Sequence, residues 1–222
     1  MHVLVNAAMS ADGKLSTRRR EQLKISGADD FARVDRLRAK TDAIVVGVGT
    51  VLADDPSLVR FDREHRDSIG KDGVPTRVVV DSTGRTPLDG AVCSDDAPTV
   101  LLSSDALSKA RRDAYESAGV TVLTAGTDRV ELSAGFTALE RTGIEHCFVE
   151  GGGELIFSLL EAGLVDRLTT YFGPLVIGGR DAPTLADGNG FVDAFPSLSL
   201  ESIERLDDGV VISWAVESIA SP

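Results

Sequence analysis

Residues 42–58, DAIVVGVGTVLADDPSL, decide the fold class, because a β-branched strand runs directly into a glycine-containing turn and then into acid-rich chain. Asp42 to Gly47 has the composition of a buried strand. Gly47 and Gly49 let the backbone bend and approach a ligand, and Thr50 is expected to cap the short helix that follows. Backbone N–H groups at a helix start attract phosphate, so this stretch predicts an anion-binding turn.

A second junction of the same kind lies far downstream, where Cys147-Phe148-Val149 runs into Glu150 and Gly151-Gly152-Gly153. Close approach of a diphosphate explains all three glycines, and a sharp crossover packed against neighbouring chain is the alternative. Glu150 either accepts hydrogen bonds from a polar ring or sugar, or is an ordinary acid at a helix start. Two such junctions predict contact with one shared ligand.

Apolar runs alternate with helical patterns, an order of elements that is typical of an α/β sheet covered by helices on both faces. Strands are expected at His2–Ala8, Asp42–Gly47, Thr76–Asp81, Thr99–Leu102, Val120–Leu123, His146–Val149 and Arg167–Phe172. Helices are expected at Ser26–Lys40, Ala106–Ser117, Gly135–Arg141 and Gly153–Glu161, the first opened by a capping box of Ser26 and Asp29. Asp207-Asp208-Gly209 predicts a hairpin between Leu198–Arg205 and Val210–Glu217, so the sheet is mixed. Residues 62–75 are expected to form a surface loop.

The chain has 222 residues, 42% of them hydrophobic, and we expect one domain over residues 1–222. Its net charge is −12, with 18 Arg and 5 Lys, which disfavours nucleic acid and anionic membranes as partners and suggests a halophilic protein. No apolar run reaches the roughly 18 residues of a membrane helix, and no secretory pattern opens the chain, so a cytoplasmic location is expected. Cys93 and Cys147 have no zinc spacing, which predicts free thiols and no metal site.

Two further loops carry groups suited to phosphate. Arg18-Arg19-Arg20 and Lys24 share one polar stretch, and clustered guanidinium groups suit a phosphomonoester, with a solvated loop as the alternative. Asp81-Ser82-Thr83-Gly84-Arg85 offers hydroxyls and an arginine for an adenosine 2′-phosphate, although turns use the same residues. The sequence has no dinucleotide fingerprint, Walker A loop, GxSxG elbow or deaminase signature, which argues against nucleophilic and zinc hydrolysis.

Four segments together resemble the reductase of riboflavin biosynthesis: Ala7 to Lys14 (AAMSADGK), Gly47 to Leu58, Asp81-Ser82, and Val149 to Gly153 (VEGGG). The likeness covers nearly the whole chain and is to the stand-alone archaeal and fungal type. It implies a dihydrofolate-reductase-like fold, a three-layer αβα arrangement with a mixed, mostly parallel sheet that ends in an antiparallel hairpin. It also implies a homodimer that uses NADPH, or NADH, to reduce the ribosylamino group of 2,5-diamino-6-ribosylamino-4(3H)-pyrimidinone 5′-phosphate to ribitylamino.

The resemblance also implies site residues. Those on the cofactor side are Ala8, Thr50, Asp54, Ser82 and Gly151-Gly152-Gly153-Glu154, to which the phosphate argument adds Arg85. Those on the substrate side are Gln22, Lys24, Arg38, Leu58, Arg60 and Glu150. Lys24 stands where bacterial chains often carry Trp, and the spacing between Leu58 and Arg60 differs by one from bacterial relatives.

The implied reaction opens the ribosylamino ring to an imine and delivers hydride to the sugar C1′, and orientation supplies much of the rate. Asp54, Glu150 and solvent are the candidates for the acid that protonates the substrate. A pterin or folate reductase on the same scaffold is one alternative, and a non-catalytic nucleotide sensor is another. The arginine loop favours a phosphorylated substrate.

Overall fold

Short β-branched runs of the sequence become strands in the computed structural model, which describes residues 1–21 and 23–217. The contacts between residues divide the chain into two units. The first unit is Met1 with Asp35–Phe148, and the second is His2–Val34 with the chain from Val149 onward. One helix, α1 (Ala28–Ala39), begins in the second unit and ends in the first.

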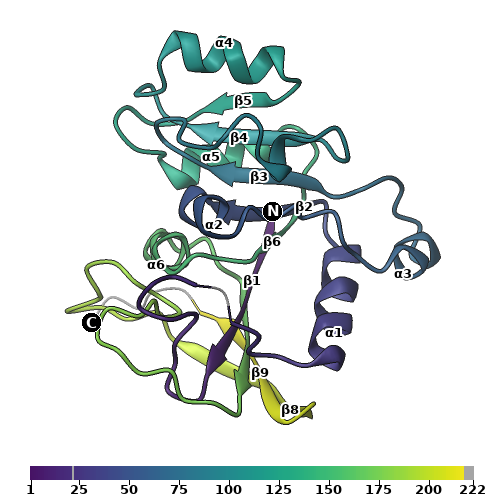
Figure 1. Ribbon diagram of the computed structural model, residues 1–222, viewed down its shortest axis with the longest axis vertical. Coiled ribbons are helices and arrows are strands. Elements are labelled where there is room, and N and C mark those ends of the chain that lie inside the picture. The colour runs from purple at the N-terminus through teal and green to yellow at the C-terminus, as the bar shows by residue number, and fades with distance from the viewer. Residues whose placement is uncertain (22, 218–222) are drawn as a thin grey trace. The chain divides into compact units, whose positions relative to one another are not determined.

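The strands of the first unit are ordered β5-β4-β3-β2-β6, as can be followed in Figure 1. The strands are β2 (Ala43–Gly47), β3 (Thr76–Val80), β4 (Thr99–Ser103), β5 (Thr121–Thr124) and β6 (His146–Val149). The helices are α2 (Val48–Asp54), α3 (Arg63–Ser68), the 3-10 turn η1 (Ala91–Cys93), α4 (Lys109–Ser117) and α5 (Leu132–Glu140). Every neighbouring pair from β2 to β5 is parallel, and the connections that cross over between these strands contain α2 and α3, the 3-10 turn η1, and α4 in turn.

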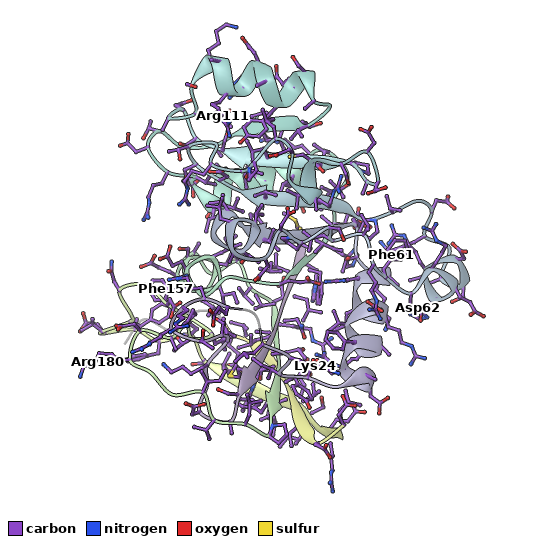
Figure 2. All side chains as sticks on the ribbon, in the orientation of Figure 1. Lys24, Phe61, Asp62, Arg111, Phe157 and Arg180 are labelled. Carbon is purple, nitrogen blue, oxygen red and sulfur yellow. The ribbon has the colours of Figure 1, made fainter. Side chains whose placement is uncertain are left out.

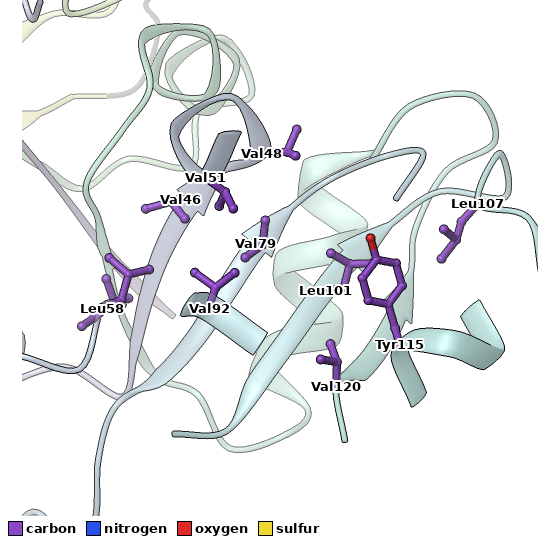
Figure 3. Packing of buried hydrophobic residues seen from close by; sticks show 11 residues of the cluster. Val46, Val48, Val51, Leu58, Val79, Val92, Leu101, Leu107, Tyr115 and Val120 are labelled. Carbon is purple, nitrogen blue, oxygen red and sulfur yellow. The ribbon is translucent and has the colours of Figure 1, made fainter. Parts of the chain in front are cut away.

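An apolar cluster joins β2, β3 and β4 to the helices of the first unit (Figure 3). Val46, Val79 and Leu101 contribute from the strands, and Val51 of α2 and Tyr115 of α4 are also buried in it. Each large buried side chain of this kind stabilises the fold by about 1.5–3 kcal/mol. The cluster therefore holds α2 against the strands of the first unit.

The second unit has the strand order β1-β7-β9-β8. Its strands are β1 (His2–Ser10), β7 (Arg167–Gly173), β8 (Leu198–Leu206) and β9 (Gly209–Val216), and its own helix is α6 (Gly153–Glu161). β1 and β7 are parallel, whereas β9 pairs antiparallel with both β7 and β8. The predicted hairpin is thus confirmed, and it makes the sheet mixed. Ile25, Tyr171 and Val211 form the apolar cluster beneath it.

The capping box predicted at Ser26 is wrong. The N–H groups of Asp29 and Asp30 donate, at 3.2 and 3.0 Å, to the carboxylate of Asp207, which lies in the turn between β8 and β9. A Cβ at Gly27 would lie 2.3 Å from Asp207 Cγ, so glycine is required there for the carboxylate to approach. The cap of α1 is therefore a side chain far away in the sequence.

The prediction that residues 62–75 form only a surface loop is also wrong, because the segment contains α3. Asp62 caps this helix by accepting the His65 N–H at 2.9 Å. Arg66 is 4% exposed and donates to the carbonyl of Ala39, the last residue of α1, at 3.0 Å and to that of Thr41, just after the helix, at 2.8 Å. A buried guanidinium that satisfies these carbonyls anchors a segment whose composition is mostly polar.

Candidate functional site

The turn between β2 and α2 is open on its outer side. Gly47 is the residue before the helix, with an extended backbone (φ −79°, ψ 151°), and no side chain caps the helix. Thr50 lies inside α2, so the prediction that it caps the helix is wrong, because Gly47 already occupies the capping position. A Cβ added at Gly49 would meet no atom within 4 Å. The free N–H groups of this turn can thus be approached from solvent.

Two adjacent acids at the end of α2 have different surroundings. Asp55 adopts a left-handed conformation (φ 41°), and its carboxylate accepts the Ala91 N–H at 2.8 Å, which ties the end of the helix to a neighbouring loop. The exposed Asp54 has no hydrogen-bond or ion-pair partner among the residues that the structure describes. Its carboxyl nevertheless lies against the protein, and this partial burial raises its pKa. Asp55 serves the fold, and Asp54 is available to a ligand.

Arg38 and Arg60 lie close together in the first unit. The Arg60 carbonyl accepts from Arg38 Nη1 at 2.9 Å, and Arg60 Nε donates to Asp35 Oδ2 at 2.8 Å. Asp35 is an acid that the sequence reasoning missed, although its i,i+3 spacing from Arg38 on one helix was a usable signal. Leu58 is 5% exposed and belongs to the apolar cluster, so a ligand could contact only its backbone.

The loop after β3 presents Ser82 and Arg85. It is held by Asp81, whose carboxylate accepts the N–H groups of Gly84 and Thr86 at 3.0 and 2.7 Å. Ser82 Oγ accepts the Val130 N–H at 3.0 Å and keeps its own hydroxyl hydrogen to donate. The exposed guanidinium of Arg85 has no partner within the described part of the chain.

The α2 turn and the β3 loop leave the same edge of the first unit. Gly47 is in register with Val80 at the carboxyl ends of the parallel strands β2 and β3. Ligands of open α/β sheets bind at such an edge. Thr50, near the start of α2, and Ser82 and Arg85, in the β3 loop, therefore follow neighbouring strands at this edge, whereas Asp54 lies at the opposite end of α2.

The glycine loop before α6 belongs to the second unit. Gly152 precedes the helix without a side-chain cap, Gly151 has a φ of 125°, and the peptide bond between them is cis. A Cβ at Gly153 would lie 2.4 Å from the Thr184 carbonyl oxygen. Close packing against the Thr184 backbone thus accounts for this third glycine, as the crossover alternative predicted. The uncapped helix start remains available to an anion.

The other predicted residues of the second unit are spread over several elements. Glu150 is half-buried at the end of β6, and Glu154 is exposed in the first turn of α6. Ala8 lies on β1 beside Tyr171 of β7 and is partly buried against the apolar cluster. Lys24 is exposed, and Gln22 lies outside the described residues.

The chain matches one family over most of its length. The model of the RibD C-terminal domain covers residues 1–212, which span both units. The chain belongs to this family. The 2,5-diamino-6-ribosylamino-4(3H)-pyrimidinone 5′-phosphate reductase of Archaeoglobus fulgidus is 46% identical over 216 residues, 96% of each chain. The protein of the same name from Methanothermobacter thermautotrophicus is 42% identical over 219 residues, 97% of this chain and 98% of that one.

Solved structures share the fold. A pyrimidine reductase-like protein from Corynebacterium diphtheriae has a TM-score of 0.84 and 21% identity, covering 97% of this chain and 92% of that one. The riboflavin biosynthesis reductase of Saccharomyces cerevisiae has a TM-score of 0.71 and 20% identity, covering 97% and 90%. The predicted family and fold class are confirmed. Within the described residues, no helix has the length and apolarity needed to cross a membrane.

Proposed function

We propose that this protein reduces the ribosylamino group of 2,5-diamino-6-ribosylamino-4(3H)-pyrimidinone 5′-phosphate to ribitylamino, with NADPH as the preferred cofactor. The observation that carries the proposal is the 46% identity over 96% of both chains to the reductase of that name from Archaeoglobus fulgidus. The reaction reduces a sugar carbon, and bound NADPH would supply the hydride. The protein then has to hold both reactants in place and provide a proton.

The residues on the cofactor side suit an anionic dinucleotide. Two helix starts, at α2 and α6, have no side-chain cap, and the space beside Gly49 is open. Ser82 has a hydroxyl hydrogen to donate, and Arg85, which has no ion pair among residues 1–21 and 23–217, carries a charge suited to the 2′-phosphate that distinguishes NADPH from NADH. We assign Thr50, Asp54 and the loop Gly151 to Glu154 to the same cofactor, together with Ala8.

We assign the proton donor to Asp54 or Glu150. A raised pKa keeps a carboxyl protonated to higher pH, which favours Asp54 as an acid. On the substrate side, Arg38 and Arg60 are held by Asp35, an arrangement that pre-orients their guanidinium groups. Gln22, Lys24 and the Leu58 backbone complete the proposed substrate contacts.

The proposal is tested by turnover of the purified chain, followed through consumption of reduced nicotinamide. We expect oxidation of NADPH with the ribosylamino-pyrimidine phosphate and none with dihydrofolate. Cofactor binding without turnover of any pyrimidine would make the protein a sensor and refute the proposal. Faster turnover of dihydrofolate would assign it to the alternative pterin and folate class.

Two neighbouring variants separate chemistry from folding. Asp54→Asn is expected to lose at least about tenfold in kcat/KM with an unchanged melting temperature, because no partner in the described chain is lost. Asp55→Asn weakens the bond to the Ala91 N–H and is expected to lower the melting temperature. If Asp54→Asn kept full activity, Asp54 would have no part in the reaction.

We also infer a homodimer that buries the outer hairpin. Leu198, Leu200 and Ile203 of β8 are 42%, 53% and 63% exposed. Ile203 pairs with Ile212 and Leu200 with Trp214, so these side chains share one face of the hairpin. Exposed apolar patches of this kind mark interfaces. Light scattering of the double variant Leu200→Glu with Ile203→Glu should report a monomer, and an unchanged mass would exclude this face.

A further inference from the structure

Two loops of the second unit leave adjacent strands at the same edge. β1 and β7 are parallel, with Ser10 in register with Gly173, so the chain after each strand emerges side by side. The Ala11 N–H donates to the Leu175 carbonyl at 2.8 Å, and the Leu15 N–H donates to the Pro183 carbonyl at 2.9 Å. The loop of residues 11–20 is thereby joined to the loop of residues 174–190.

Asp12 holds the turn of the second loop in place. Its carboxylate accepts the N–H groups of Ile177 and Gly178, at 3.0 and 2.7 Å, and the Ser10 hydroxyl at 2.6 Å. These hydrogen bonds, of which that from Ser10 has the largest effect, lower the pKa of Asp12 to about 2, so its carboxylate is charged at neutral pH. Gly178 and Gly179 have φ values of 68° and 89°, which allow the tight turn that leads into Arg180.

This turn lies beside an arginine from a distant part of the sequence. A Cβ at Gly179 would lie 3.9 Å from Arg18 Cβ, so Arg18 is beside the residue that precedes Arg180. Both side chains are exposed, and neither guanidinium has a hydrogen-bond or ion-pair partner among residues 1–21 and 23–217. The only acid next to them in the sequence, Asp181, makes no ion pair with either within these residues.

This pairing is unusual in a chain with a net charge of −12. Asp and Glu outnumber Lys and Arg by 35 to 23, yet Arg18 lies beside the turn that carries Arg180, and neither guanidinium is paired with an acid among residues 1–21 and 23–217. An anion with several acceptor oxygens can accept hydrogen bonds from two guanidinium groups that have no acid partner. The planar guanidinium is the side chain best suited to bind a phosphate ester through two parallel hydrogen bonds.

Lys24 is not part of this pair. Figure 2 shows Lys24 and Arg180 well apart within the second unit. The sequence suggested one cationic loop from Arg18 to Lys24. In the structure, the cation near Arg18 is instead Arg180, which belongs to the loop of residues 174–190.

We propose that Arg18 and Arg180 form a binding site for the phosphate ester of a ligand, with Asp12 as the residue that positions Arg180. The site deepens the proposed function, on which it rests for the identity of the ligand. The phosphate can belong to the pyrimidine substrate, as its 5′-phosphate, or to the dinucleotide, and the kinetic experiment below distinguishes the two.

The first test measures binding of inorganic phosphate to the whole chain by calorimetry, which is independent of turnover. Arg18→Ala and Arg180→Ala are each expected to weaken phosphate binding about tenfold or more. The matched control is Arg141→Ala, which removes an exposed arginine of the first unit. Equal phosphate affinity in all three variants would overturn the site. Binding that is lost only in Arg18→Ala and Arg180→Ala upholds the site even if the proposed reaction is wrong.

The second test is steady-state kinetics of the same variants. A tenfold higher KM for the pyrimidine phosphate, with unchanged KM for NADPH, identifies the substrate 5′-phosphate. A higher KM for NADPH but not for NADH identifies the 2′-phosphate, and a higher KM for both identifies the pyrophosphate. Asp12→Asn should reproduce the KM effect of Arg180→Ala while keeping kcat. KM values equal to those of Arg141→Ala for every reactant would refute the proposal.

Discussion

Replacement of Asp207 by alanine should uncap α1. The substitution removes the acceptor of the Asp29 and Asp30 N–H groups, which are bound at 3.2 and 3.0 Å. Loss of an N-cap costs about 0.5–2 kcal/mol of stability. Asp207 also has a φ of 49°, a conformation that alanine disfavours by roughly another 1 kcal/mol. The expected destabilisation is therefore about 1.5–3 kcal/mol.

For a chain of this size, each kcal/mol lowers the melting temperature by about 2–4 °C, so a fall of roughly 3–12 °C is expected in thermal denaturation followed by circular dichroism. Asp207→Asn keeps one side-chain oxygen and tolerates the left-handed backbone, so it should lose less. Asp208→Ala, at the exposed second position of the same turn, is the control. If Asp207→Ala melted at the same temperature as Asp208→Ala, the long-range cap would have no energetic role.

Four further results are expected. Gly49→Ala should raise the melting temperature slightly, since it replaces a helical glycine in open space, and it should weaken cofactor binding. Gly153→Ala should lower the melting temperature, because its Cβ would lie 2.4 Å from a carbonyl oxygen. The folded-state pKa of Asp12, about 2, lies below its usual value of 3.8, so its stabilisation is complete above about pH 4 and is lost as the pH falls towards 2. The melting-temperature difference between the wild type and Asp12→Asn should therefore shrink over that range. A constant difference would show that the ionised Asp12 carboxylate does not stabilise the fold. With a net charge of −12, the melting temperature should rise with added salt, and maximal stability in dilute buffer would argue against halophilic adaptation.

Local sequence determined the elements whose signals are short-range. The β6 strand and helix α6 begin and end where their apolar pattern predicted, at His146–Val149 and Gly153–Glu161. The hairpin also follows from its turn residues, because turn chemistry and side-chain periodicity act over a few neighbouring positions. The family motifs, read in this order along the chain, identified the reductase fold.

Tertiary structure decided which polar groups meet. Asp207 caps a helix from 178 positions away, and Arg66 gives a polar segment a buried anchor. The turn that carries Arg180 comes to lie beside Arg18 because β1 and β7 are neighbours and the loops that follow them meet. Hydrogen-bond partners of this kind share no local pattern, so the sequence can supply the charged groups, but only the folded chain selects their partners.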